Sequence, residues 1–282
     1  MNHNHSFMII FKDRPGNSKA VSRLVANTPP GTRLICLTPS PEVCSDFGRK
    51  GVCCIGLASD EREPFPEAYA VLILSEMQLD KMNRLQAGVL FPDGEINPGI
   101  DPDWIILQGC HFYGIPCTIR EGNGLRIRES TAGDAAVLLP GLKKEGLSVS
   151  VQDWESYTEN AYRIQGYGMW TVETKSGTGQ NKTGSSTYTA AGWCGLHPGE
   201  LPEGGTELGY YILPQFRGLG IAGEACRMIC SYAGDSLGIE RLLLRIRKEN
   251  RSSRNLAEKL LFQEMKETAE EILYCKDLSR SG

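Results

Sequence analysis

The chain has 282 residues, enough for two ordinary domains that each bury a core, and its formal net charge of -4 gives no reason to expect a nucleic acid partner. No apolar run approaches the roughly 18 residues that cross a bilayer, and the start of the sequence lacks the pattern of a secretory signal, so we expect a cytoplasmic protein without a membrane partner. The ten cysteines lie mostly in apolar runs without a C-x-x-C pair, which indicates buried, reduced thiols and no metal site.

The first part of the chain alternates short apolar segments with helical patterns. Strands are predicted at 7–11, 33–38, 52–58 and 68–74, and helices at 17–27, 40–51 and 75–88. This β-α-β-α order is typical of a parallel sheet covered by helices, and it predicts a small α/β layer domain over residues 1–120. Residues 89–123 are richer in Gly, Pro and Asp, and we expect a linker near 120–124.

The second part, residues 124–282, is predicted to be a separate domain. A strand at its start leads into a helix, and Thr131 and Asp134 have the spacing of a capping box at that helix. The remaining pattern predicts strands at 167–174, 189–197, 206–213, 241–247 and 271–278, and helices at 151–166, 222–238 and 252–263. The first two of these strands form a predicted hairpin, joined by a Gly/Ser/Thr-rich segment that we expect to be mobile.

The stretch QFRGLGIAGEAC, residues 215–226, carries two overlapping glycine patterns. Gly218, Gly220 and Gly223 spell the G-x-G-x-x-G of dinucleotide-binding proteins, but that fold needs several further strand–helix units and only about 59 residues follow. The same stretch contains Q-x-x-G-x-G and R-x-x-G-x-A. A strand, a glycine loop and a helix N-terminus in succession favour backbone N–H groups that bind a diphosphate, with a purely structural turn as the alternative.

In these surroundings the segment ELGYYILPQFRGLGIAGEA, residues 207–225, resembles the fourth strand, acetyl-CoA loop and third helix of the GNAT-type N-acetyltransferases. The segment RIRKENRSSRNLAEKLLF, residues 245–262, is similar to the fifth strand and fourth helix of that family. The resemblance covers about 124–282. It implies a mixed, mostly antiparallel sheet with flanking helices, and a fold class of α/β for the whole chain.

The resemblance in the second segment is incomplete. Asn250 and Ser253 match the pair that faces the CoA arm in the family, and Phe262 matches the aromatic residue that closes the helix. Leu261 stands where the family has a glycine before that aromatic residue. Ala257 stands where some members place a tyrosine that acts as the general acid.

The resemblance implies acetyl-CoA as the co-substrate. Backbone groups of the fourth strand would hold the pantetheine arm, and the diphosphate would lie on residues 216–222 with Arg217 as a charge-assisted contact. The implied acetyl-CoA-binding residues are Ile212, Leu213, Gln215, Phe216, Arg217, Gly218, Leu219, Gly220, Ile221, Ala222, Asn250 and Ser253.

Acetyl transfer to an amine requires a base for the amine proton and a proton for the departing thiolate. Glu207 is the candidate base, because it shares a strand face with Gly209 and Tyr211 and the glycine leaves room for a substrate. A solvated carboxylate at the strand end is the alternative. Tyr211 is the candidate acid, with Tyr210 and Tyr274 as substitutes, and each is equally well explained as a packing aromatic.

Residues 34–57 faintly resemble the strand–Thr/Ser–helix–strand unit of haloacid-dehalogenase-like phosphatases. Lys12 and Arg14 stand where those enzymes have their two aspartates, so phosphatase activity is not expected. We therefore expect a non-catalytic domain that serves substrate docking, dimerisation or spacing.

The sequence thus predicts an acetyl-CoA-dependent N-acetyltransferase that moves an acetyl group directly to a primary amine. A CoA-binding regulatory pseudoenzyme is the alternative, and a nicotinamide-dependent oxidoreductase is a weaker one. The acceptor is either a small-molecule amine or a protein or peptide amine, shaped by residues 131–166 and 175–188. Asp153, Glu155 and Glu159 would attract a cationic amine, or would form the solvated face of a helix.

Overall fold

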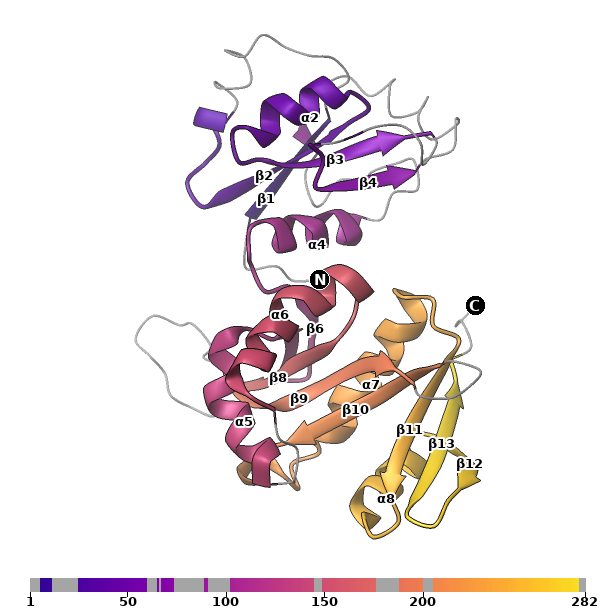
Figure 1. Cartoon of the computed structure of the whole chain (residues 1–282). Coiled ribbons are helices and arrows are strands. Elements are labelled where there is room, and N and C mark those ends of the chain that lie inside the picture. The colour runs from indigo at the N-terminus through magenta and orange to yellow at the C-terminus, as the bar shows by residue number, and fades with distance from the viewer. Residues whose placement is uncertain are drawn as a thin grey trace. The chain divides into compact units, whose positions relative to one another are not determined.

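The computed structural model describes residues 6–11, 25–59, 65, 67–73, 89–90, 102–144, 149–175, 188–199 and 205–278. The chain divides into two compact units, one within residues 3–117 and one within residues 118–282 (Figure 1). Each unit has its own sheet and its own buried core. None of the described helices is long and apolar enough to cross a membrane.

The N-terminal unit is a five-stranded sheet with a helix packed on each face. Its elements are β1 Ser6–Phe11, β2 Thr32–Thr38, α2 Pro41–Gly48, β3 Cys53–Ala58, β4 Ala70–Ile73, β5 Val89–Leu90 and α4 Pro102–Phe112. The strand order is β4–β3–β2–β1–β5, in which the first four strands are parallel and β5 is antiparallel to β1. The predicted parallel α/β layer is therefore confirmed.

Burial on both faces explains why the strands of this unit are apolar throughout. On one face, Val43 and Phe47 of α2 pack in a cluster with Cys36 and Cys54 of the sheet. On the other face, Ile105 of α4 belongs to a separate cluster with alternate residues of the same strands. All ten cysteines of the chain are free and nine are buried, as expected from their apolar surroundings.

The C-terminal unit is an eight-stranded sheet. Its elements are β6 Thr118–Gly122, β7 Leu125–Glu129, η1 Ala132–Asp134, α5 Ala135–Lys144, α6 Val151–Gln165, β8 Met169–Lys175, β9 Tyr188–Pro198, β10 Thr206–Ile212, η2 Pro214–Phe216, α7 Ile221–Asp235, β11 Arg241–Arg247, α8 Arg251–Lys259, β12 Gln263–Glu267 and β13 Glu271–Asp277. The strand order is β12–β13–β11–β10–β9–β8–β7–β6, and every neighbouring pair is antiparallel except β10 with β11. The predicted mixed, mostly antiparallel sheet with flanking helices is confirmed.

The two faces of this sheet bury different sets of side chains. One face packs against α7 and α8 and holds the larger cluster, which includes Cys226, Ile229 and Leu260. The other face packs against α5 and α6 through a smaller cluster around Leu138 and Trp154. Successive residues of β10 therefore contribute to opposite faces, as the alternation of a strand requires.

Some predicted boundaries are wrong. Residues 120–124, expected to be a linker, complete β6 and its tight turn to β7, with Asn123 and Gly124 at φ values of 50° and 77°. The strand β12 was not predicted because all five of its side chains are exposed and show no apolar alternation. No element was assigned at 102–112, which forms α4. The predicted helix at 75–88, most of that at 17–27 and most of the segment 175–188 lie outside the described residues.

A buried ionic network fixes the start of α5. Arg128 donates to both carboxylate oxygens of Asp134 at 2.8 Å and to Glu173, which also accepts from Arg126. Asp134 accepts from the N–H and the hydroxyl of Thr131, so the predicted capping box is present. Burial opposes ionisation of Asp134, but the Arg128 guanidinium and the Thr131 donors outweigh it and lower the pKa of Asp134.

The end of α8 contains a strained residue. Leu261 lies in the left-handed region with φ 64°. The residue is 76 % exposed, so burial of its side chain offsets little of this strain. The Phe262 N–H donates to the Ala257 carbonyl across it, which closes the helix in a Schellman motif. This backbone conformation favours glycine, which is the residue that the resemblance in sequence leads one to expect at position 261.

Replacing Leu261 by Gly is expected to raise the free energy of unfolding by about 1 kcal/mol, because a left-handed non-glycine residue costs about that much and an exposed side chain contributes little burial. Urea unfolding of the two proteins measures the difference. The matched control is Glu258→Gly, at an exposed position in the last turn of the same helix, which should lower stability by up to about 1 kcal/mol. A neutral or destabilising Leu261→Gly change would show that the leucine side chain contributes a contact that exceeds the strain.

The Asp134→Asn variant is expected to be less stable by about 2 kcal/mol at pH 7, because it removes one of the two carboxylates that pair with the buried Arg128 and leaves only Glu173. Since the pKa of Asp134 is lowered on folding, its contribution is complete above the unfolded pKa of about 3.9 and is lost as the pH falls through the folded pKa. Denaturant unfolding between pH 7 and pH 3 should show the two proteins converging at the acid end. A constant difference across that range would mean that the ionised form contributes nothing.

Candidate functional site

The site begins where two parallel strands separate. Within the described strands, β10 pairs with β11 through Thr206–Leu242 and Glu207–Leu243 and no further, whereas β10 pairs with β9 along its whole length. Figure 1 shows β10 and β11 diverging from this point. The edge of β10 beyond Glu207 that faces β11 therefore has backbone groups without a strand partner.

A close contact between β9 and β10 explains the divergence. A Cβ atom at Gly192 of β9 would overlap the carbonyl oxygen of Tyr211, so the two backbones approach at a distance that only glycine permits. The ladder continues past the end of β10, where the Leu213 N–H donates to the Ala191 carbonyl at 2.9 Å. β10 therefore follows β9 and leaves β11.

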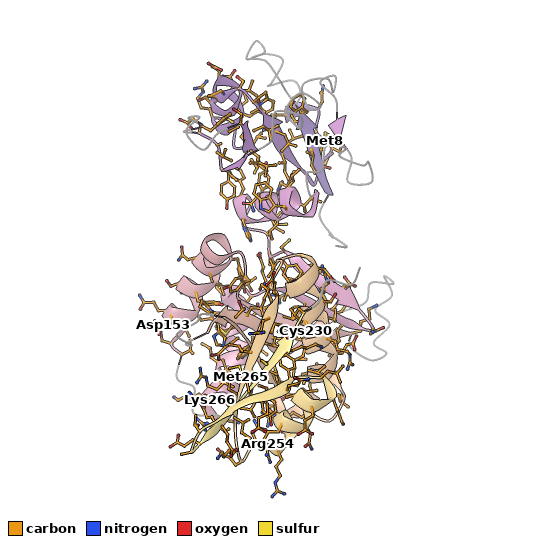
Figure 2. The ribbon with its side chains drawn as sticks, turned by 90° about the vertical axis from the view of Figure 1, so that its right-hand side faces the viewer. Met8, Asp153, Cys230, Arg254, Met265 and Lys266 are labelled. Carbon is orange, nitrogen blue, oxygen red and sulfur yellow. The ribbon has the colours of Figure 1, made fainter. Side chains whose placement is uncertain are left out.

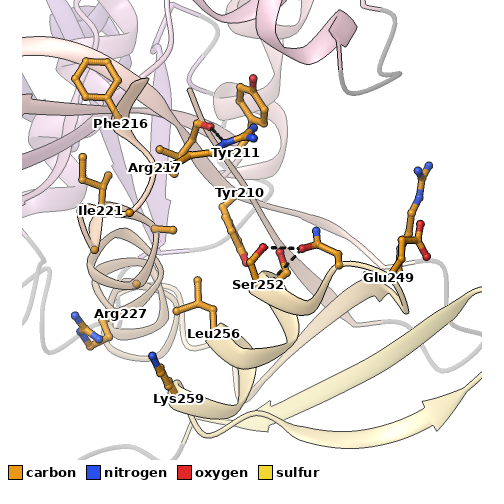
Figure 3. A pocket seen from close by; sticks show the side chains of 18 residues that line it. Tyr210, Tyr211, Phe216, Arg217, Ile221, Arg227, Glu249, Ser252, Leu256 and Lys259 are labelled. Carbon is orange, nitrogen blue, oxygen red and sulfur yellow. Dashed lines mark hydrogen bonds between the residues drawn. The ribbon is translucent and has the colours of Figure 1, made fainter. Parts of the chain in front are cut away.

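A pocket of about 870 Å³ lies between the end of β10, the glycine loop, α7 and α8 (Figure 3). Of the residues assigned from the sequence, those that line it are Tyr211, Ile212, Phe216, Arg217, Gly218, Gly220, Ile221, Ala222, Asn250 and Ser253. Those assigned but not among its lining residues are Glu207, Leu213, Gln215 and Leu219. The lining residues that the sequence analysis missed as ligand contacts are Tyr210, Gly223, Arg227, Arg247, Glu249, Ser252, Leu256 and Lys259.

The glycine loop leaves the start of α7 open. Gly218 and Gly220 both have φ 78°, and space is open where their Cβ atoms would lie. Gly220 is the N-cap of α7 and has no side chain to accept from the first-turn N–H groups. These donors and the helix dipole form a site for an anion. Gly223 serves packing instead, because a Cβ atom there would lie 3.3 Å from Leu256 of α8.

Three residues that the resemblance implies as acetyl-CoA contacts do not line the pocket. Leu213 uses its N–H for Ala191 and its carbonyl for the Phe216 N–H, so its backbone is committed within the protein. Gln215 and Leu219 are exposed and lie off the pocket wall. The wall of the pocket is formed by residues on either side of them.

Asn250 and Ser253 lie at the start of α8, where a helix-capping hydrogen bond joins them. The Asn250 side chain is the N-cap and accepts from the Ser253 N–H at 3.1 Å and from the Ser252 hydroxyl at 2.9 Å. The three-residue spacing read from the sequence is therefore also the spacing of a helix cap. Capping turns this end of α8, and both residues, towards the pocket (Figure 3).

The two neighbouring tyrosines of β10 leave the strand on opposite sides (Figure 3). Tyr210 lines the pocket and is hydrogen-bonded to Ser253, and burial raises the pKa of Tyr210 to about 12. The hydroxyl of Tyr211 lies against Gly141 of α5 and has no hydrogen-bond partner among the described residues. Arg217 lies over the Tyr211 ring, 5.5 Å from its centre, and donates from Nε to the Ile212 carbonyl at 2.9 Å.

Glu207 lies at the point where β10 and β11 last pair. Its side chain is 6 % exposed and its Oε1 lies 2.8 Å from Nη2 of Arg245 on β11. The alternative of a solvated carboxylate is therefore wrong. Glu271 of β13 lies 3.8 Å from the same guanidinium but is more exposed. Arg245 thus provides the charge that makes burial of the Glu207 carboxylate possible.

The pocket has an excess of positive charge. Arg217, Arg227, Arg247 and Lys259 line it, against the single carboxylate of Glu249. Together with the uncapped N-terminus of α7, this charge favours a polyanionic ligand. The volume lies within the range of about 300–1,000 Å³ typical of small-molecule sites.

Comparison with known proteins gives one family. Residues 126–263 match the family model described as "Acetyltransferase (GNAT) domain". A search of curated proteins found no match. The comparisons give no support to the resemblance between residues 34–57 and the haloacid-dehalogenase-like phosphatases, or to the alternative of a regulatory pseudoenzyme.

Solved structures with a similar chain trace include three acetyltransferases. One, from Agrobacterium tumefaciens, is 18 % identical with a TM-score of 0.44, covering 56 % of this chain and 92 % of that one. A spermidine N-acetyltransferase from Vibrio cholerae, in complex with CoA and spermine, is 15 % identical with a TM-score of 0.47, covering 56 % and 98 %. A ribosomal L7/L12 alpha-N-protein acetyltransferase is 14 % identical with a TM-score of 0.45, covering 58 % and 95 %.

Proposed function

We propose that this chain, whose residues 126–263 match the family model of the GNAT acetyltransferase domain, transfers an acetyl group from acetyl-CoA to a primary amine. The observation that carries the proposal is the separation of β10 from β11 after Glu207, which opens a pocket against the uncapped start of α7. A strand edge with unpaired backbone groups and a helix N-terminus suit the two parts of CoA, an amide-containing arm and a diphosphate.

The pocket residues fit CoA in charge and in hydrogen bonding. The first-turn N–H groups of α7 behind Gly218 and Gly220 would bind the diphosphate. The amides of the pantetheine arm would then pair with the edge of β10 near Tyr211 and Ile212 that β11 leaves without a strand partner, and they would displace Arg217 from the Ile212 carbonyl. Asn250 and Ser253 would flank the arm from α8.

In the proposed reaction the neutral amine nitrogen attacks the thioester carbonyl carbon. A carbon–nitrogen bond forms, the carbon–sulfur bond breaks, the amine loses a proton and the thiolate gains one. Glu207 is the proposed base, acting through a water molecule, because it is a carboxylate held at the apex of the strand separation by Arg245.

Tyr210 fits the role of proton donor better than Tyr211. With a pKa of about 12 it carries its proton at neutral pH, and its hydroxyl group is on the pocket side of β10. The hydroxyl of Tyr211 lies on the other side, against α5. The acceptor is a small-molecule amine or a protein or peptide amine, and relatives in structure bear names of both kinds.

Thermal unfolding with and without acetyl-CoA tests the ligand. At a hundredfold excess over its dissociation constant, a ligand of the folded state adds about 2.7 kcal/mol of stability. We expect this gain for the wild type and for Gly220→Asn, and its loss for Gly220→Asp, which has the same shape but places a carboxylate at the anion site.

NADH serves as the control ligand in this experiment. Stabilisation by NADH in place of acetyl-CoA would show that the glycine loop binds a dinucleotide. Equal loss of the acetyl-CoA effect in both variants would mean that backbone strain at Gly220, and not charge, controls the loop.

The Glu207→Gln variant is expected to lower kcat at least about a hundredfold, because it removes the base and keeps the shape of the side chain. Release of CoA thiol with a panel of small amines and peptides with free N-termini measures it. Glu271→Gln is the matched control, since it removes the outer carboxylate beside Arg245 and should change kcat little. If kcat fell equally in the two variants, Glu207 would serve only to hold Arg245 in position and would not act as the base.

A further inference from the structure

Two cationic side chains line the pocket where α7 and α8 pack together. Arg227 comes from the second turn of α7 and Lys259 from the last turn of α8. Figure 3 shows both at the same end of the pocket, with Glu249 far across it. Both line the pocket, yet neither belongs to the glycine loop or to the Asn250–Ser253 pair.

The guanidinium of Arg227 is fixed in position by two neighbours. Its Nε and Nη2 donate to a single oxygen of Glu224, at 3.1 and 2.7 Å. The other oxygen of Glu224 accepts from the side chain of Asn123, on the turn between β6 and β7, at 2.7 Å. These contacts also lower the pKa of Glu224, first through Asn123 and then through Arg227, so the carboxylate stays charged at neutral pH.

This arrangement directs the third nitrogen of Arg227 towards the start of α7. Nη1 lies 3.8 Å from the position that a Cβ atom of Gly223 would occupy, so the side chain folds back over the first turn of the helix. Among the described residues Nη1 has no hydrogen-bond acceptor, and the side chain is 60 % exposed. An oriented donor is thus left open beside the diphosphate site.

Lys259 supplies the second charge. Its ammonium group forms no ion pair or hydrogen bond with the described residues, and it faces the pocket next to Leu256. Gly223 allows α8 to pack closely on α7 through Leu256, so that a residue of each helix, Arg227 and Lys259, lines the same pocket. Arg227 keeps one open donor beside its ion pair with Glu224, and Lys259 keeps its whole charge, so a bound anion would accept hydrogen bonds from both.

We propose that Arg227 and Lys259 bind the 3′-phosphate of the CoA ribose and make the pocket selective for CoA over dephospho-CoA. In CoA this phosphate monoester and the diphosphate are attached to the same ribose, at its 3′- and 5′-oxygens. If the diphosphate binds at Gly220, the 3′-phosphate is therefore separated from that site by one ribose ring. The monoester carries close to two negative charges at neutral pH, which two converging cations match. This inference rests on the proposed function, because it assumes that CoA occupies the pocket.

Isothermal titration calorimetry at an ionic strength of about 0.15 M tests the inference, since general surface electrostatics are then screened. The wild type is expected to bind CoA roughly tenfold or more tightly than dephospho-CoA. The double variant Arg227→Ala, Lys259→Ala should bind both ligands with the weaker affinity of dephospho-CoA. Adenosine 3′,5′-bisphosphate should compete with CoA better than adenosine 5′-diphosphate for the wild type, and no better for the double variant.

Lys266→Ala is a control for the loss of a surface charge, because Lys266 is exposed on β12 and is not a lining residue of the pocket (Figure 2), and it should keep the wild-type preference. Circular dichroism and thermal unfolding verify that each variant is folded. Equal affinity of the wild type for CoA and dephospho-CoA, or an equal loss for both ligands in the double variant, would overturn the inference. Failure of both ligands to bind the folded wild type would instead overturn the proposed function.

Discussion

The backbone hydrogen bonds of β10 are divided unequally between its two neighbours. β10 pairs with β9 along its whole length, and the two backbones approach closely at Gly192. On its other edge, β10 pairs with β11 at only two residue pairs. A sheet interior normally satisfies every backbone group with another strand, so an unpaired edge inside a sheet is costly unless a ligand or a side chain completes it. The pocket, the exposed start of α7 and the position of Glu207 all depend on this incomplete pairing.

The sequence allowed the loop to be predicted because its signals are local. Gly218 and Gly220 need positive φ, and the helix that follows them starts within one residue of the expected position. The same holds for Asn250 and Ser253, whose spacing also makes a helix cap. The missed lining residues carry no local signal. Arg227 and Lys259 are 32 positions apart in the sequence and approach only through the packing of α7 on α8.

The environment of the carboxylate could not be predicted for a related reason. Glu207 lies near a strand end, where a polar residue suggests exposure, but β11 brings Arg245 beside it and the pair is buried together. β12 was missed because an exposed edge strand has no apolar alternation to detect. In the N-terminal unit the reverse holds: apolar strands buried on both faces predict the sheet well, while their uniformity contains no information on function.

Arg217 gives the site a property that bears on the lifetime of its complexes. Its Nε donates a hydrogen bond to the Ile212 carbonyl, which lies on the part of β10 that β11 does not pair with. A ligand amide that takes this carbonyl therefore exchanges one hydrogen bond for another and gains little net free energy from it. The arginine can return as the ligand departs, so dissociation never leaves the carbonyl unsatisfied. If CoA is the ligand, as proposed, such an exchange would lower the barrier to its departure and favour rapid turnover over tight retention.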